Sequence, residues 1–143
     1  MPRPSHDLES AIANATRAAV SALFREYADH HFYYCLLVTT GEAHCPCLAA
    51  WSRESLAAAA AASTDPNAER DLKWSYADSP FYCYGDHFFV SLRRLFDARP
   101  PVHFSNPTWA REYELRLAAM ERASRSSMSR VCLGRASRGT PSL

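Results

Sequence analysis

Cysteine and histidine are the residue types of this sequence that could bind a metal or act as nucleophiles. Cys45 and Cys47 lie in the stretch HCPCLAAW, and Cys83 and His87 follow further along the chain. Three thiolates and one imidazole would make a tetrahedral zinc set. Only Pro46 separates the first two cysteines, whereas structural zinc sites place paired cysteines further apart around a tight turn. The spacing therefore favours ordinary half-buried thiols over a metal site.

A thiol enzyme is the second chemistry that this set could support. Cys83 precedes a predicted helix whose N-terminal end would lower a thiol pKa, and Asp86 and His87 follow it. The sequence favours Asp86 as a helix cap and His87 as an exposed residue of the first turn. Cysteines two residues apart on a strand rarely reach disulfide geometry, and the redox spacing is Cys-x-x-Cys. We therefore predict no enzyme and no cofactor. The alternative is a metal- or thiol-dependent enzyme centred on Cys45, Cys47, Cys83 and His87.

Length and composition describe the chain that has to position these residues. Its 143 residues fit a single domain, and a net charge of +1 does not call for a nucleic-acid or membrane partner. No apolar run approaches the roughly 20 residues that span a bilayer. Acidic residues occupy the N-terminal stretch where the apolar core of a signal peptide would lie. We expect a cytoplasmic protein that has no membrane partner.

Hydrophobic periodicity predicts a long amphipathic helix in the first part of the chain. Its apolar residues recur at spacings of three and four: Leu8, Ile12, Ala15, Ala19, Leu23 and Tyr27. FYYCLLVTT and HCPCLAAW then predict an antiparallel hairpin at about residues 32–50, with Pro46 at an edge or a bulge. On such a strand Cys45 and Cys47 share a face, and His44 points the other way.

Further helices are predicted in SRESLAAAAAAS, with Ser52 as cap, and in DHFFVSLRRLFDAR and NPTWAREYELRLAAMERAS. The predicted fold class is α+β, a small antiparallel sheet packed with three to four helices. Residues 1–124 form the single domain. Residues 125–143, rich in arginine and serine, are predicted to be a loosely ordered tail with at most a short strand at 131–133.

The densest run of large side chains is LKWSYADSPFYCYGDHFF, at residues 72–89. A segment punctuated by Pro80 and Gly85 is expected to be extended or looped, and it cannot bury every aromatic side chain. Exposed aromatic residues beside acidic ones are typical of a protein-binding surface, and a loop packed over the sheet is the alternative. The predicted partner contacts are Trp74, Tyr76, Asp78, Tyr82, Tyr84 and Asp86.

The C-terminal part of the chain is basic. Residues 111–138 carry seven arginines against three glutamates. Such an end could touch phosphates. Arginine-rich tails are more often solvated, and this one lacks the interleaved aromatic residues of a single-strand binder. Nucleic-acid binding through the arginine-rich C-terminus is therefore the second alternative function.

The order of these segments resembles an uncharacterised bacterial family defined as a domain of unknown function. The likeness is carried by FYYCLLVTT after a long first helix, then SRESLAAA, LKWSYADSPF and FFVSLRRLF, between about residues 5 and 120. Members are small cytoplasmic α+β proteins, and some resemble immunity proteins encoded beside polymorphic toxins. The family has no established catalytic set to carry over. The resemblance implies a non-enzymatic protein that binds and neutralises a cognate toxin, and it leaves the oligomeric state open.

Overall fold

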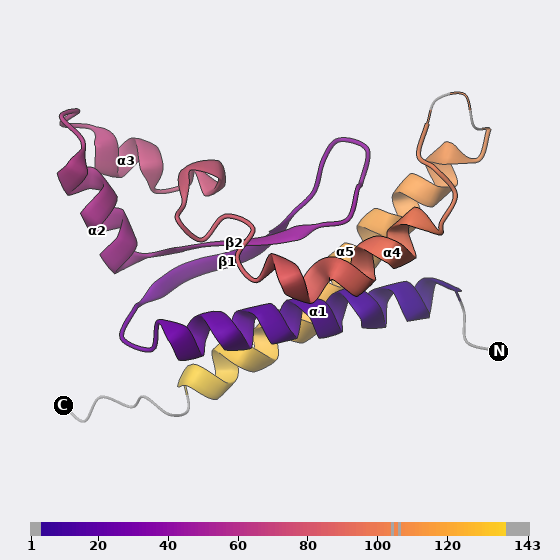
Figure 1. Ribbon diagram of the computed structural model, residues 1–143, viewed down its shortest axis with the longest axis horizontal. Coiled ribbons are helices and arrows are strands. Elements are labelled where there is room, and N and C mark those ends of the chain that lie inside the picture. The colour runs from indigo at the N-terminus through magenta and orange to yellow at the C-terminus, as the bar shows by residue number, and fades with distance from the viewer. Residues whose placement is uncertain (1–3, 104, 106, 137–143) are drawn as a thin grey trace.

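The computed structural model describes residues 4–103, 105 and 107–136. In chain order its elements are α1 (Pro4–Glu26), β1 (Phe32–Val38), β2 (Cys47–Ser52), α2 (Arg53–Ala62), α3 (Ala68–Leu72), the 3₁₀ turns η1 (Tyr76–Asp78) and η2 (Asp86–Phe89), α4 (Val90–Asp97) and α5 (Trp109–Ala136). The long helices α1 and α5 lie against each other, and the β1–β2 hairpin lies along one side of this pair (Figure 1). Helices α2 and α3 project at one end, and α4 lies near the other (Figure 1). The predicted α+β class and the hairpin at 32–50 are confirmed.

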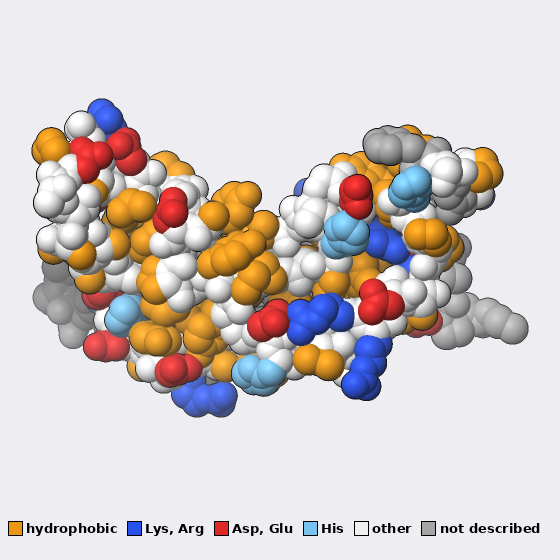
Figure 2. Space-filling model, turned by 45° about the horizontal axis from the view of Figure 1, so that its top comes forward, with side chains coloured by type: hydrophobic (Ala, Val, Ile, Leu, Met, Phe, Trp, Pro, Cys, Tyr) orange, Lys and Arg blue, Asp and Glu red, His pale blue; other side chains and the backbone are white. Residues whose placement is uncertain are grey.

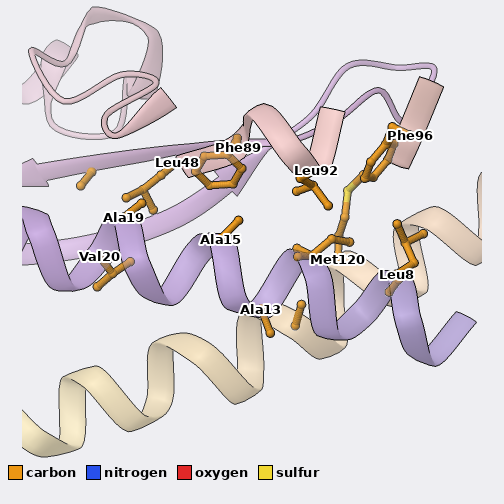
Figure 3. Close-up of a cluster of buried hydrophobic side chains, with 14 of the residues drawn as sticks. Leu8, Ala13, Ala15, Ala19, Val20, Leu48, Phe89, Leu92, Phe96 and Met120 are labelled. Atoms are coloured by element: carbon orange, nitrogen blue, oxygen red, sulfur yellow. The ribbon is translucent and has the colours of Figure 1, made fainter. Parts of the chain in front are cut away.

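The core forms around the apolar face that the periodicity of the first helix predicts. Five of the six predicted positions are buried in α1, and Tyr27, just beyond its end, is half-buried. Phe89, Leu92 and Phe96, from η2 and α4, pack into the same cluster, together with Met120 from α5 (Figure 3). The side chains of Ala15 and Ala19 are small, so η2 and α4 can approach this face of α1 closely.

Buried hydroxyl groups in the two long helices are satisfied within their own helix. Thr16 Oγ1 donates to the Ile12 carbonyl at 2.7 Å, and Ser127 Oγ donates to the Ala123 carbonyl at 2.6 Å. Both side chains are fully buried. A hydroxyl that bonds to the carbonyl one turn back carries no unpaired polar atom into an apolar interface. These residues therefore fit into the core without the cost of an unsatisfied group.

The hairpin is antiparallel, with Cys35 opposite Ala50 and Leu37 opposite Leu48. Five of the six residues of β2 are buried, so the strand lies between the helices on one side and the segment after α3 on the other. Because β2 begins only at Cys47, strand alternation does not extend back to Cys45, and the prediction that the two cysteines share a face does not apply. Cys45 packs against the core cluster.

Helix α2 begins as predicted at a serine cap. Ser52 Oγ accepts the Ser55 backbone N–H at 3.0 Å, and Ser55 Oγ accepts the Ser52 N–H at 3.2 Å, which completes a capping box. His30 Nδ1 lies 2.8 Å from Ser52 Oγ. The reciprocal bonds fix the direction in which α2 leaves the sheet, and α3 packs against it.

The C-terminal segment differs from its prediction. Helix α5 continues to Ala136, so the short strand expected at 131–133 is wrong, and residues 125–136 of the expected loose tail are helical. The buried positions Met120, Ala123 and Ser127 are three to four residues apart and extend the apolar stripe past the predicted end. Packing against α1 therefore overrides the low helix propensity of the serines. Residues 137–143 lie outside the described residues.

None of the described helices combines the length and the apolar composition that crossing a bilayer requires.

A substitution at Gly85 tests the close approach between η2 and α1. Its φ of +68° is in the left-handed region, and an added Cβ would come within 3.0 Å of Ala19 Cβ and of a Phe88 ring carbon. We expect Gly85→Ala to lower the free energy of unfolding by about 2 kcal/mol in urea titrations, through backbone strain and crowding. Gly41→Ala is the matched control, because nothing lies within 4 Å of its added Cβ. Equal stability of the two variants would contradict the close approach.

Candidate functional site

The predicted partner contacts fall into two groups by exposure. Trp74 is 66% exposed, Tyr76 42% and Tyr82 45%, and these three aromatic residues define what we call the aromatic surface. Asp78 and Asp86 are also exposed. Tyr84 is half-buried, with its ring among Tyr27 and Phe81 and its hydroxyl donating to a Glu26 carboxylate oxygen. The structure thus brings five of the six predicted contacts to solvent and uses Tyr84 mainly for packing.

Hydrogen bonds tie the segment that carries the aromatic surface to the sheet. Trp51 Nε1 donates to the Ser75 carbonyl at 2.8 Å, and the Tyr84 N–H donates to the Leu48 carbonyl at 3.2 Å. Ser79 Oγ donates to the Ala50 carbonyl. These three bonds tie residues 75–84 to β2 although the segment has little regular structure. The side chains that it presents to solvent are therefore fixed in place by a buried strand.

Trp74 rests on two tyrosines of β1. Its ring stacks on Tyr34 at a centroid distance of 5.7 Å and an interplanar angle of 20°, and it meets Tyr33 edge-on at the same distance. The Tyr33 hydroxyl donates to the Lys73 carbonyl at 2.6 Å, and Lys73 Nζ lies 5.5 Å from the Trp74 ring centre. Burial raises the pKa of Tyr34 to about 12. No local pattern in the sequence links Trp74 to Tyr33 or Tyr34, which are about forty residues away in the chain. The sequence therefore did not predict that these two tyrosines support the Trp74 ring.

The acidic members of the predicted set have local partners. Asp78 accepts the Ser75 hydroxyl at 2.5 Å and so closes the η1 turn. Asp86 forms an ion pair with Arg93 at 2.7 Å across the first turns of η2 and α4. Both carboxylates remain exposed. Both can therefore contact a partner, while Asp78 also holds the turn that carries Tyr76 and Asp86 holds the start of α4.

The cysteine set does not assemble. Within the described part of the chain, no three His, Cys, Asp or Glu side chains are grouped as metal ligands would be. Cys47 contacts Cys83, whereas Cys45 lies near Arg93, and His87 packs against Phe88 with ring centres 4.1 Å apart. Burial raises the pKa of Cys45 to about 11, and burial together with the Cys83 contact raises that of Cys47 to about 12. A catalytic thiol needs the opposite shift.

Arginines of α5 are engaged in ion pairs along the described helix. Arg122 pairs with Glu9 at 2.9 Å and Arg125 with Glu121 at 2.6 Å. Arg116 is buried and takes part in the network described next. Each of these cations already has a carboxylate neighbour, which weakens the attraction of this face for phosphates.

A buried ion-pair network lies at the other end of the molecule, and sequence analysis did not find it. Glu112 accepts from Arg99 Nε at 2.7 Å and from Arg116 Nε at 3.0 Å. Arg116 also donates to the carbonyls of Ala43 and Pro100 at 3.2 and 3.0 Å. The network therefore joins the loop between β1 and β2, the segment after α4 and α5. The i,i+4 spacing of Glu112 and Arg116 was its one signal in the sequence.

These two regions lie on separate arms. Figure 2 shows a hollow between an arm that carries α2 and α3 and an arm formed by the hairpin loop, α4 and the start of α5. Hydrophobic side chains gather on the first arm beside the hollow, and histidine and arginine side chains gather on the second (Figure 2). The molecule thus presents a concave face with two chemically different sides.

Comparison with known proteins finds one family. A model described as a domain of unknown function (DUF4303) matches residues 12–127, which is most of the chain. The same comparison finds no curated protein and no solved structure that matches the chain.

Glu112 is the centre of the buried network, and its removal leaves two buried cations. We expect Glu112→Gln to lower the free energy of unfolding at pH 7 by about 3 kcal/mol, measured by urea titration. Glu121→Gln, which breaks an exposed pair, is the control and should cost at most about 0.5 kcal/mol.

The loss in Glu112→Gln should depend on pH. Burial raises the pKa of Glu112, but the two arginines outweigh burial and hold it below the ordinary 4.5. The carboxylate therefore stabilises the fold fully above pH 4.5, and its contribution fades as pH falls through the lowered pKa. The difference between wild type and Glu112→Gln should shrink in that range. A difference that stayed constant down to pH 3 would contradict this assignment.

Thiol reactivity tests the raised pKa values. At pH 8 a thiol of pKa about 11 instead of 9.0 has roughly a hundredfold less thiolate. We expect iodoacetamide to alkylate Cys45 and Cys47 at least about a hundredfold more slowly in the folded protein than in guanidinium, followed by peptide mass mapping. Equal rates in the two states would mean that the thiols are exposed and ionisable.

Proposed function

The chain belongs to the family described as a domain of unknown function (DUF4303), and we propose that it acts as a non-enzymatic protein-binding domain. In its specific form, the proposal is a bacterial immunity protein that works in the cytoplasm and neutralises a cognate toxin by masking its active site.

One observation carries the proposal. The large hydrophobic side chains that are exposed in the described part of the chain are Trp74, Tyr76, Tyr82 and Val90, and they all fall between residues 74 and 90. Single exposed hydrophobic residues are ordinary, but their concentration in one segment indicates an interaction site. Tryptophan and tyrosine supply large contact areas at a low cost in side-chain entropy, and they dominate binding energy at interfaces.

The support beneath the aromatic surface favours binding by a prepared site. Trp51, Ser79 and Tyr84 tie its backbone to β2, and Trp74 is stacked on Tyr34. A partner would therefore not have to order this segment on binding, which removes part of the entropic cost of association. The exposed carboxylates of Asp78 and Asp86 supply the polar rim that surrounds the apolar centre of most interfaces.

The rival functions have less support in the structure. A thiol or metal enzyme centred on Cys45, Cys47, Cys83 and His87 would need side chains that converge. Cys47 and Cys83 are in contact, but no three described His, Cys, Asp or Glu side chains are grouped as metal ligands would be, and the pKa values of Cys45 and Cys47 are raised. Among the arginines of α5 whose side chains the structure describes, Arg116, Arg122 and Arg125 are already paired with glutamates, which gives nucleic-acid binding through this end less support. A net charge of +1 likewise gives no long-range attraction for polyanions.

Substitutions in the aromatic surface test the proposal, with the protein encoded beside the gene as the candidate toxin. We expect Trp74→Ala and Tyr82→Ala each to weaken the complex by about 2 kcal/mol, or roughly thirtyfold, in calorimetric titrations. Thermal unfolding should change little, because both side chains are exposed. Protection of cells that express the toxin should fall in parallel.

Tyr84→Phe is the matched control, because it removes an aromatic hydroxyl from the same segment at a half-buried position. It should leave affinity unchanged. Absence of a complex with the neighbouring gene product, together with absence of protection, would overturn the immunity function. Equal loss of affinity in Tyr84→Phe and Trp74→Ala would move the interface away from the aromatic surface.

A further inference from the structure

The arm opposite the aromatic surface contains a cleft of about 450 Å³ above the buried ion-pair network. It opens between the loop that joins β1 to β2 and the segment that follows α4, and we call it the arginine cleft. Arg99, Arg116, His44 and His103 line it together with Phe96 and Val102. We propose that the arginine cleft is a binding site for a carboxylate group.

The charge beneath the cleft is not balanced. Arg99 and Arg116 share the single carboxylate of Glu112, so these three groups carry a net charge of +1. Their side chains are only 14%, 5% and 7% exposed, for Arg99, Arg116 and Glu112 respectively. A buried charge without a counter-charge is costly, and one further anion would remove that cost.

Donors remain for such an anion. Each of the three guanidinium nitrogens of Arg116 already has an acceptor within the fold. Arg99 donates to Glu112 through Nε and Nη2, and its Nη1 has no hydrogen-bond acceptor among the described residues. At the rim, His103 uses Nδ1 on Ser105 and leaves Nε2 for a ligand. An anion in the cleft would thus meet one arginine donor and one imidazole.

The other charges near the cleft do not supply the missing anion. Arg93 lines the cleft and is neutralised by Asp86. Asp97 also lines it, but its carboxylate is exposed and forms no hydrogen bond or ion pair with the described residues. An exposed carboxylate is screened by water and compensates a buried cation poorly. His44 is occupied by Thr40 and lies 3.3 Å from Glu42.

The excess charge and the cleft walls favour a carboxylate over a phosphate. A single negative charge balances a net charge of +1, whereas a phosphate dianion would leave an excess of the opposite sign. Phe96, Pro101 and Val102 give the cleft apolar walls, which suit the short aliphatic stem of an organic acid or of an acidic side chain. The carboxylate can come from a free organic acid or from a glutamate or aspartate of a protein partner. The second source rests on the proposed protein-binding function.

Acetate is the probe for the site itself. We would titrate the full ¹⁵N-labelled chain with sodium acetate at constant ionic strength and follow the arginine Nε–Hε resonances. We expect a saturable shift of the Arg99 resonance and none for Arg70, which pairs with Asp71 at the surface. Acetamide has nearly the same shape without the charge and should cause no saturable shift.

Two variants separate binding from folding. Arg99→Gln removes the excess positive charge and should abolish the acetate response, which in this variant is followed through the Nε–Hε resonance of Arg116, a second residue that lines the cleft. His103→Ala lies outside the ion-pair network, so it keeps the test valid if Arg99→Gln does not fold, and it should weaken acetate binding about tenfold. His87→Ala, an exposed histidine outside the cleft, is the control and should not change the acetate affinity.

A second pair of ligands, two short peptides, identifies whether the carboxylate comes from a protein or from a free organic acid. A blocked Gly-Glu-Gly peptide that binds more tightly than acetate, with no binding of its Gly-Gln-Gly counterpart, would assign the site to a protein side chain. Acetate binding without peptide binding would assign it to a free organic acid. The proposal is overturned if the Arg99 resonance does not respond to acetate, if acetamide acts like acetate, or if Arg99→Gln binds acetate normally. Because acetate binding needs no protein partner, it can succeed or fail independently of the immunity function.

Discussion

The outer edge of β2 is the constraint on which the rest of the structure depends. A two-stranded hairpin is marginal by itself, and the edge of a strand leaves carbonyl groups that need partners. Here the carbonyls of Leu48 and Ala50 accept hydrogen bonds from the Tyr84 backbone and from the Ser79 side chain. An irregular segment therefore takes the place of a third strand. It covers the sheet, buries Trp51, and sets the direction of the side chains between residues 74 and 82.

The segment that covers β2 also determines the surroundings of two cysteines. The turn that brings Tyr84 to β2 places Cys83 next to Cys47, with Cys83 in a left-handed conformation at φ +54°. Both thiols are half-buried, and the pKa of Cys47 rises to about 12 as a result. The packing that prepares the aromatic surface thus makes the Cys47 thiol less ionisable. In the described residues the cysteines act as small packing groups.

The two sides of the concave face are held by different physical means. Hydrogen bonds to β2 and stacked rings hold the segment that carries the aromatic surface. On the opposite arm, the ion pairs of Glu112 hold the hairpin loop, the segment after α4 and α5 together. Arg116 fixes the hairpin loop through the carbonyl of Ala43, a buried residue with φ +53°. If both proposals hold, a partner would bring an apolar surface to one side of the hollow and an acidic group to the other. Such a combination discriminates between partners better than hydrophobic contact alone, because an unpaired charge is penalised.

Local sequence patterns were enough to locate several parts of this protein. Spacings of three and four residues located the buried face of α1, alternating and aromatic runs located the hairpin, and Ser52 was recognisable as the cap of α2. The sequence also indicated that residues 72–89 hold more aromatic side chains than an irregular segment can bury. These inferences hold because periodicity and capping are properties of neighbouring residues.

Tertiary structure decided what depends on residues that are distant in the chain. Hydrogen bonds to β2 determine which aromatic side chains are exposed. Tyr84, which was predicted to contact a partner, is half-buried, and its hydroxyl donates to Glu26. Helix α5 ran beyond its predicted end because α1 supplied an apolar surface for it. The buried network joins Glu112 to Arg99 and to the carbonyl groups of two loops, and only folding brings these together. Long-range contacts carry no local periodicity, so the arginine cleft could be found only in three dimensions.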